Sequence, residues 1–351
     1  RLLASGGQDR SVRVWDVIAG REIASLPVEP GTRWIAFSPD GTMLLTASGA
    51  GATKLWRMPS GAPVGELPGH KQLLGATFCE TGACIVTWDM EKLVIWDTTT
   101  LAPRASYEQK AEFRAATVSR TGALIAIGTK SGELILLRGD GSLIARRIAH
   151  DDLIFDIAIS PDESVVATGS NDRTARLWTA AGEPRGILAG HRANITRVRF
   201  TPDGEHLVTT SADNTARVWS ASGMLIGELT GHTALVYAAA VRSDGRRLAT
   251  ASWDHTVRVW DLAHLEELRP ILTARDAPSP KVAFDPSGEH LAVARTNGTL
   301  SVVDVRTGEA ACTASGALPI ERIVWIGSEQ IAAVRRGGQA VEIWNTQGCT
   351  Q

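Results

Sequence analysis

The chain has 351 residues, of which 44% are hydrophobic, enough to build a large buried core. Charged residues make up 21%, and the formal net charge is only -2. This balance argues against a basic nucleic-acid binder and against an acidic disordered tail. No apolar run reaches the roughly 18 residues of a membrane span, and no signal peptide is visible. We therefore expect a cytoplasmic protein without membrane contact. The chain starts at Arg1 in the middle of a strand pattern, so the sequence leaves open whether a targeting segment lies upstream.

The first elements in chain order are short strands. Residues 2–15 resemble the second and third strands of a unit that ends at Trp15, and Arg21 to Leu26 is a further strand. The segment Ser38-Pro39-Asp40-Gly41 has the preferences of a type I turn, with Pro second and Gly fourth. Another strand follows at Ala62 to Leu67.

Four cysteines are too few for a disulfide framework or a four-cysteine zinc site. Cys79 and Cys84 flank a predicted hairpin turn, whereas Cys312 and Cys349 lie far along the chain. We expect buried thiols, with a Cys79–Cys84 cross-strand bridge as the alternative for an oxidising compartment.

A repeat of roughly 41 residues runs through the chain, marked by tryptophans and, in two repeats, by Leu137 and Val303 in the same phase. In the clearest unit, Gly231-His232 precedes strands at Val236 to Val241, Arg247 to Ser252 and Thr256 to Trp260. A fourth, weaker strand leads into the next unit. The tryptophans are Trp15, Trp56, Trp96, Trp178, Trp219, Trp260 and Trp344.

Four strands per repeat with a Gly-His…Trp-Asp signature resemble the WD-repeat family. The resemblance covers nearly the whole chain and implies an all-β propeller of four-stranded antiparallel blades. A ring of seven blades closes if Ala62 to Leu67 pairs with Ala340 to Trp344, and we favour this arrangement. Residues 1–61 would then be partial blades of a preceding propeller or extra repeats, 62–345 the propeller, and 346–351 a tail. If Arg21 to Leu26 closes the ring instead, it has eight blades.

Three repeats carry His, Ser, Asp and Trp at a fixed spacing, which invites comparison with a hydrolase triad. An enzyme needs one such site rather than three, and the resembled family uses these residues as a buried hydrogen-bonded tetrad in each blade. We therefore predict structural tetrads and no catalytic residues. The sets are His150, Ser170, Asp172 and Trp178; His191, Ser211, Asp213 and Trp219; and His232, Ser252, Asp254 and Trp260. His70, Asp89 and Trp96 form a partial set with shorter spacing.

Basic residues recur two positions before the tryptophan. They suggest either a phosphate-binding stripe or, as we favour, outer strands with packed stems and solvated charges. They are Arg13, Lys54, Arg176, Arg217 and Arg258.

The resemblance also implies a binding rim, built from residues after the Gly-His pair and before the turn Asp. Aromatic residues there could be contact sites or could pack against neighbouring loops. The rim positions are Trp88, Leu153, Phe155, Asn171, Asn194, Thr196, Ala212, Leu235, Tyr237 and Trp253. We expect Phe155, Tyr237 and Trp253 to line one rim of one face.

The sequence therefore predicts a non-catalytic, monomeric scaffold or sensor module that binds a protein or peptide, without cofactor, metal or nucleic acid. Its arginine and alanine content indicates a bacterial genome, and the array resembles the C-terminal half of large signalling proteins, so another domain of the same parent chain is a candidate partner. No Gly-Lys-Ser/Thr phosphate loop occurs. The alternative is an enzyme, or a propeller that binds a small ligand or metal in its central channel, although His206, His255, His264 and His290 lack ligand spacing.

Overall fold

A computed structural model describes most of the chain. The described residues are 2–6, 10–16, 21–79, 81–109, 112–242, 244–273, 281–295, 297–305, 307, 309–315, 320–326, 329–335 and 341–346. The chain divides into two compact units. The first comprises Arg1–Thr168 and Trp178–Pro184, and the second comprises Gly169–Leu177 and Arg185–Arg336, with further short segments beyond residue 336.

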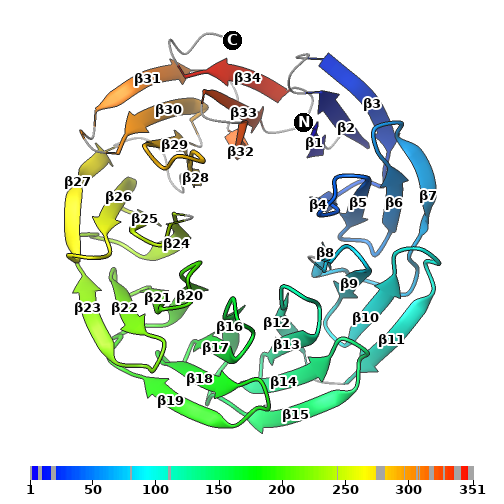
Figure 1. The fold of residues 1–351 in the computed structure, drawn as a ribbon, viewed down its shortest axis with the longest axis horizontal. Helices are drawn as coiled ribbons and strands as arrows, with labels where there is room; N and C mark the ends of the chain where they lie inside the picture. The colour runs from blue at the N-terminus through cyan, green and yellow to red at the C-terminus, as the bar shows by residue number, and fades with distance from the viewer. Residues whose placement is uncertain are drawn as a thin grey trace. The chain divides into compact units, whose positions relative to one another are not determined.

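The described strands form nine antiparallel sheets, and Figure 1 shows the consecutive strands of each sheet side by side. The first four sheets are β1 (Leu2–Gly6), β2 (Ser11–Asp16) and β3 (Arg21–Pro27); β4 (Thr32–Phe37), β5 (Met43–Ser48), β6 (Thr53–Arg57) and β7 (Ala62–Glu66); β8 (Gly75–Phe78), β9 (Cys84–Trp88), β10 (Lys92–Asp97) and β11 (Pro103–Glu108); and β12 (Phe113–Val118), β13 (Leu124–Thr129), β14 (Glu133–Arg138) and β15 (Leu143–Ile148).

The remaining five sheets repeat this order. They are β16 (Ile154–Ile159), β17 (Val165–Ser170), β18 (Ala175–Thr179) and β19 (Pro184–Leu188); β20 (Ile195–Phe200), β21 (His206–Ser211), β22 (Ala216–Ser220) and β23 (Leu225–Leu229); β24 (Val236–Val241), β25 (Arg247–Ser252), β26 (Thr256–Asp261) and β27 (Glu266–Thr273); β28 (Lys281–Phe284), β29 (His290–Ala294), β30 (Thr299–Asp304) and β31 (Ala310–Ser315); and β32 (Ile320–Ile326), β33 (Gln330–Arg335) and β34 (Val341–Asn345).

Tight turns join the strands as the sequence predicts. At Ser38-Pro39-Asp40-Gly41, the Gly41 amide donates to the Ser38 carbonyl at 2.8 Å. Gly41 has a φ of 70°, a conformation that glycine adopts without steric cost. The Asp40 side chain accepts from the Ser38 hydroxyl at 2.6 Å, and these hydrogen bonds lower the pKa of its carboxyl. The predicted type I turn is confirmed.

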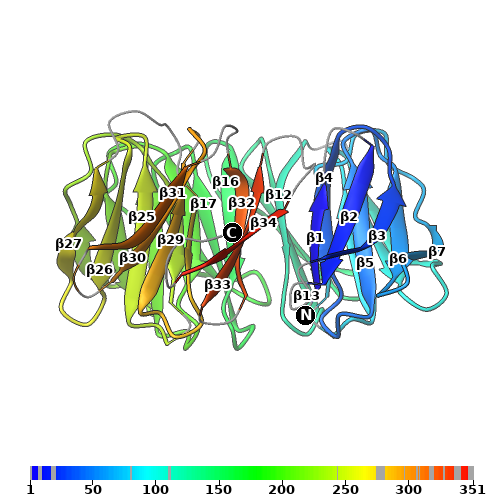
Figure 2. The ribbon, with the colours of Figure 1, turned by 90° about the horizontal axis from the view of Figure 1, so that it is seen from above.

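The hydrophobic core lies between neighbouring sheets. In the first unit, Leu55 of the second sheet packs with Ile85 and Trp96 of the third sheet. In the second unit, Val259 packs with Leu291 in the same way. Figure 2 shows the strands lengthwise, with β1 and β2 standing beside β5 and β6. No helix in the described part of the chain is long and apolar enough to cross a membrane.

The closing strand favoured from the sequence is wrong. A seven-bladed ring required Ala62 to Leu67 as the strand that completes the last blade, but β7 is the fourth strand of the second sheet and pairs with β6. The turn between them is short, with the Gly61 amide donating to the Arg57 carbonyl at 2.8 Å, so local pairing costs little loop entropy. Seven of the described sheets have four strands, and the first and last have three. The fold agrees with the eight-bladed alternative and not with seven blades.

The expectation of buried thiols at Cys79 and Cys84 is also wrong. The two residues form a disulfide across the turn that joins β8 to β9, with their Cα atoms 5.4 Å apart. The Cys79 amide donates to the Cys84 carbonyl at 2.9 Å, so antiparallel pairing brings the two side chains together. Cys312 is also disulfide-bonded, and Cys349 lies outside the described residues.

Candidate protein-binding site

A buried hydrogen-bonded network supports the loops of the sheet β24–β27. His232 Nδ1 lies 2.7 Å from the Asp254 carboxylate, and His232 Nε2 lies 2.9 Å from the Thr250 hydroxyl. Trp260 Nε1 donates to that same hydroxyl at 2.9 Å. One buried threonine therefore joins a histidine on a loop to a tryptophan on β26.

The predicted serine members of the tetrads are wrong, because the linking hydroxyl belongs to the threonine two residues earlier. Thr209 contacts His191 Nε2 and Trp219 Nε1, each at 2.9 Å. Thr168 likewise contacts His150 and Trp178, at 2.7 and 3.1 Å. The predicted Ser211 instead donates to the Ala193 carbonyl and accepts from the Asp213 amide. Ser170 and Ser252 occupy the same place in their strands, and each accepts an amide from Asp172 or Asp254.

A further complete set lies in the sheet β8–β11, where the sequence indicated only a partial one. His70 contacts Asp89 at 2.9 Å and Thr87 at 2.8 Å, and Trp96 Nε1 donates to Thr87 at 2.8 Å. Burial lowers the pKa of His70, although the Asp89 carboxylate opposes this shift. The shorter spacing in the sequence leaves the network intact because β8 has only four residues and its register with β9 is regular.

In two sheets, apolar residues replace both the tryptophan and the threonine of the indole–hydroxyl hydrogen bond. Leu137 and Val303 occupy the tryptophan position of their sheets. The position equivalent to Thr209 is then Ile127 or Val293, both buried. An apolar pair therefore replaces the donor and the acceptor together, which avoids an unsatisfied buried polar group.

The Asp254 carboxylate holds two loops at the end of this sheet. It accepts from the Thr233 amide after His232 at 2.9 Å and from the Thr256 amide at 2.8 Å. Burial alone would raise the pKa of Asp254, but hydrogen bonds from Thr256, Thr233 and His232 outweigh burial and lower it. Its side chain is 4% exposed, so a charged group fixes these loops from inside.

This geometry does not form a hydrolase triad in the sets with complete contacts. The ring of His232 contacts Asp254 and Thr250, while the Ser252 hydroxyl donates to the Ala234 carbonyl at 2.7 Å. Ser252 is fully buried. A nucleophile must reach both its base and a substrate, and Ser252 does neither in this arrangement.

Trp253 is the most exposed aromatic residue in the described part of the second unit. It precedes Asp254 in the turn between β25 and β26, its amide donates to the Leu235 carbonyl at 2.9 Å, and its side chain is 57% exposed. Tyr237 on β24 is half-buried; burial and the charge of Asp254 raise the pKa of its phenol. Asp254 therefore follows a tryptophan that faces solvent and lies near a tyrosine that is partly covered.

The other rim positions differ in exposure. In the second unit Asn171 is exposed, while Asn194, Ala212 and Leu235 are half-buried. Thr196 is buried, and its hydroxyl donates to the Val236 carbonyl at 2.5 Å. This hydrogen bond explains why Thr196 does not belong to an exposed rim.

The first unit contains Trp88, Leu153 and Phe155, all half-buried. The Arg114 guanidinium lies over the Phe155 ring, 5.1 Å from its centroid, within the range of a cation–π interaction. The Trp88 ring lies against Gly75, where a Cβ atom would meet the ring at 1.9 Å. Trp88 therefore fits the packing alternative, whereas Phe155 keeps a partly open face beside a cation.

Four of the five recurring basic residues lie beside carboxylates. Lys54 contacts Glu66 at 3.3 Å and Arg217 contacts Glu228 at 2.9 Å, each across the sheet from the third to the fourth strand. Arg13 and Arg176 also have carboxylate neighbours, at 3.5 and 3.8 Å. These contacts neutralise the charge locally and do not favour a phosphate stripe.

Asp203, Glu205 and His206 form the one group among the described residues that could offer three atoms to a metal ion. Both carboxylates are exposed, and Asp203 already accepts from the Thr201 hydroxyl and the Glu205 amide. These bonds are those of an ordinary turn, and we assign the group no metal.

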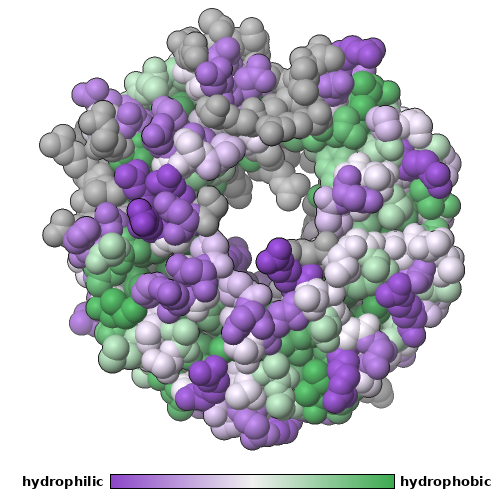
Figure 3. Space-filling model, in the orientation of Figure 1, coloured by the Kyte–Doolittle hydropathy of each residue, from purple (hydrophilic) through white to green (hydrophobic). Residues whose placement is uncertain are grey.

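A second exposed apolar surface lies on outer strands of the second unit. We call Ile187, Met224, Leu225 and Ile226 the β23 patch; their exposed fractions run from 38% to 68%. Gly223, beside Met224, lies next to Leu188 of β19, which places β19 close to the turn before β23. Figure 3 shows apolar atoms gathered over β22 and β23.

These sheets, turns and buried networks have the fold of a WD40 β-propeller. Five segments match the family described as "WD domain, G-beta repeat", at residues 1–16, 29–57, 141–179, 182–220 and 223–261. The sheets β8–β11, β12–β15 and β28–β31 show that repeats outside these segments keep the same strand order.

Similar proteins agree with this fold. The Nuclear distribution protein PAC1 of Arthroderma otae is 26% identical over 57% of this chain, and the Protein LST8 homolog of Drosophila melanogaster is 29% identical over 57%. The aligned part spans 41% of the first relative and 69% of the second. The C-terminal WD40 domain of Sif2 superposes with a TM-score of 0.72 at 20% identity, covering 86% of this chain and 92% of that one. These sequence relatives are eukaryotic and lend no support to a bacterial origin.

Proposed function

We propose that this chain is a non-catalytic scaffold that binds a protein partner, and that Trp253 is the centre of its contact surface in the second unit. The observation that carries the proposal is a 57% exposed tryptophan on a turn. The buried Asp254 carboxylate holds that turn by accepting hydrogen bonds from backbone amides. A large, exposed aromatic side chain on a rigid loop loses little conformational entropy when it is covered by a partner.

Tyr237 and Leu235 would extend this surface because each is partly exposed and precedes or lies on β24. In the first unit, Phe155 with Arg114 would be a separate contact that favours a partner with apolar and acidic side chains. Binding energy at interfaces concentrates in a few aromatic and arginine side chains, and these residue types match that pattern.

We further propose that the scaffold works within a larger signalling or sensor protein, where another domain could be the partner. In support, the chain spans less than half the length of the PAC1 relatives that it matches.

The test uses a displayed library of random peptides, selected on the full chain and then measured one by one. Trp253→Ala should weaken binding of the selected peptides at least about tenfold, the equivalent of 1.4 kcal/mol. Met224→Ala is the matched control, because Met224 is a similarly exposed apolar residue in the β23 patch.

Asp254→Ala completes the design. It should lower the melting temperature more than Trp253→Ala, because it removes a buried acceptor of several hydrogen bonds. If Trp253→Ala and Met224→Ala bind the selected peptides as well as the unaltered chain does, Trp253 is not the centre of the contact surface.

A further inference from the structure

Two neighbouring cavities in the second unit differ in their linings. One, with a volume of about 400 Å³, is lined by the charged residues Arg242, Arg247, Glu289, His290 and Asp304. The other, of about 420 Å³, is lined mainly by apolar residues of β24, β28 and β32, together with Asp285. Arg242 lines both, so the two cavities adjoin at this residue. Their size lies in the range of roughly 300–1,000 Å³ that is usual for small-ligand pockets.

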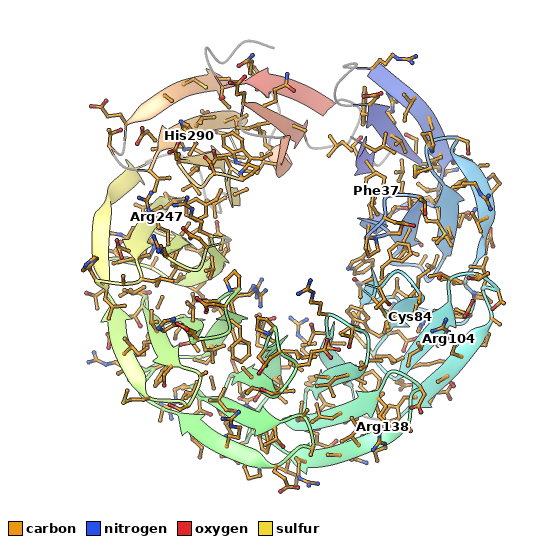
Figure 4. The ribbon with its side chains drawn as sticks, in the orientation of Figure 1. Phe37, Cys84, Arg104, Arg138, Arg247 and His290 are labelled. Carbon is orange, nitrogen blue, oxygen red and sulfur yellow. A yellow bond between two sulfur atoms is a disulfide. The ribbon has the colours of Figure 1, made fainter. Side chains whose placement is uncertain are left out.

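The charged cavity holds opposite charges that do not neutralise each other. Arg247, at the start of β25, and Glu289, before β29, form no ion pair within the described part of the chain. Arg242 differs, because its guanidinium contacts Asp244 at 3.4 Å and donates to the Ser287 carbonyl. Figure 4 labels Arg247 and His290, which come from neighbouring sheets. The side chains of Arg247 and Glu289 therefore remain available to a ligand.

The apolar cavity is built around two aromatic residues. Phe284 ends β28, and Trp325 lies on β32 with its Nε1 donating to the Ala283 carbonyl at 2.9 Å. This hydrogen bond satisfies the only polar atom of the indole and fixes the ring. Ile323 adds an aliphatic wall. A flat or branched apolar side chain would fit such a lining.

We propose that these adjoining cavities together bind a free amino acid with an aromatic or large aliphatic side chain. The carboxylate would pair with Arg247, the ammonium with Glu289, and the side chain would enter the cavity of Phe284 and Trp325. A residue at the end of a peptide carries only one of these two charges, so it would leave the other charged residue without a partner. The free amino acid satisfies both, and it is therefore the ligand that the lining favours.

Isothermal titration of the full chain with L-phenylalanine tests the proposal, against three analogues that each lack one feature. N-acetylphenylalanine has no ammonium, phenylalaninamide has no carboxylate, and glycine has no apolar side chain. L-phenylalanine should bind at least about tenfold more tightly than each analogue, the equivalent of 1.4 kcal/mol.

Variants assign the contacts. Arg247→Gln should weaken L-phenylalanine at least about tenfold but leave phenylalaninamide unchanged, and Glu289→Gln should weaken L-phenylalanine but leave N-acetylphenylalanine unchanged. Arg246→Gln is the matched control, since Arg246 is adjacent and exposed and does not line either cavity. Melting curves verify that each variant is folded.

Three results would overturn the proposal. The first is the absence of saturable binding of L-phenylalanine up to about 10 mM, a concentration above the millimolar range of weak ligands. The second is equal binding of L-phenylalanine and its analogues. The third is an equal effect of Arg246→Gln and Arg247→Gln on binding. Tighter binding of N-acetylphenylalanine or phenylalaninamide would assign the cavity to a peptide end instead.

Discussion

Thr209 shows how much can depend on one hydroxyl. It is fully buried and contacts both His191 and Trp219 at 2.9 Å. The sequence places Thr209 and Ser211 on the same face of one strand, and the same pair recurs in two other repeats. Pattern alone cannot select between them, because the choice depends on how far the His and Trp rings reach. The sequence signal for this role was that the threonine and the serine recur together in the same repeats.

Thr209→Val should lower the free energy of unfolding by about 2–4 kcal/mol, because it keeps the shape but leaves two buried ring nitrogens without this partner. Denaturant unfolding measures the change. Thr230→Val is the matched control, since Thr230 is exposed and has no side-chain hydrogen bond among the described residues. A cost for Thr209→Val no larger than that of the control would show that the threonine does not link the network.

His70 gives the stability of the protein a dependence on pH. Burial lowers its pKa, so the unfolded chain binds the proton more readily than the folded chain does. Stability is then complete above the usual histidine pKa of about 6.5 and falls as the pH drops below that value.

We expect His70→Asn to be less stable at neutral pH, and its free energy of unfolding to depend less on pH between about 7 and 5. Urea titrations at several pH values measure both quantities. The comparison is between the slope of the unaltered chain and the slope of the variant, so that contributions from other groups cancel. Equal slopes would mean that His70 is not the group responsible.

At the scale of single strands, the sequence was most reliable where turn residues and alternation agree. The strands at Val236–Val241 and Arg247–Ser252 were predicted with the bounds that the structure shows. The pairing of Ala62–Glu66 was not predicted correctly. A fourth strand can in principle pair within its own sheet or complete another sheet, and the short turn to β6 decides which of these occurs.

The strand β23 has little of the protection that edge strands usually carry. Several other outer strands contain Pro or an arginine, as in β11 and β19, whereas the sequence of β23 is LIGEL. Its one charged residue, Glu228, is paired with Arg217 at 2.9 Å. Exposed apolar edges promote pairing between chains.

Ile226→Lys should therefore reduce self-association at high protein concentration while changing the free energy of unfolding by less than about 0.5 kcal/mol. Sedimentation over a range of concentrations measures the association. Thr230→Lys is the control, because it adds the same charge next to β23 without removing an exposed aliphatic side chain. If both variants reduce association equally, net charge rather than the β23 patch is responsible.

For the molecule as a whole, the fold class was predictable because the repeat is long, regular and punctuated by His, Trp and Gly. The rim was predictable only in part, since equivalent positions need not be equally exposed: Trp253 faces solvent, whereas Trp88 packs on Gly75. A sequence pattern does not show that the backbone of a neighbouring strand, such as that of Gly75, comes close enough to cover a side chain.

Each sheet depends on its neighbour for stability, because the hydrophobic core lies between two neighbouring sheets. A chain shortened to residues 62–351 would lose Leu45 and Leu55, which cover Ile85 and Trp96 of the third sheet. We expect this shortened chain to aggregate or to melt at a lower temperature than the full chain. Sedimentation and calorimetry measure this. A monomer with an unchanged melting temperature would show that the sheets from 62 onward need no such cover.

The tryptophans of the buried networks also provide spectroscopic labels. Trp56, Trp96, Trp219 and Trp260 lie in four different sheets, and each indole donates to a threonine hydroxyl in a dry environment. Water entry would break that bond and shift the indole emission to longer wavelengths. Variants that keep one of these tryptophans at a time, with phenylalanine at the other positions, would report the order in which individual sheets open during unfolding.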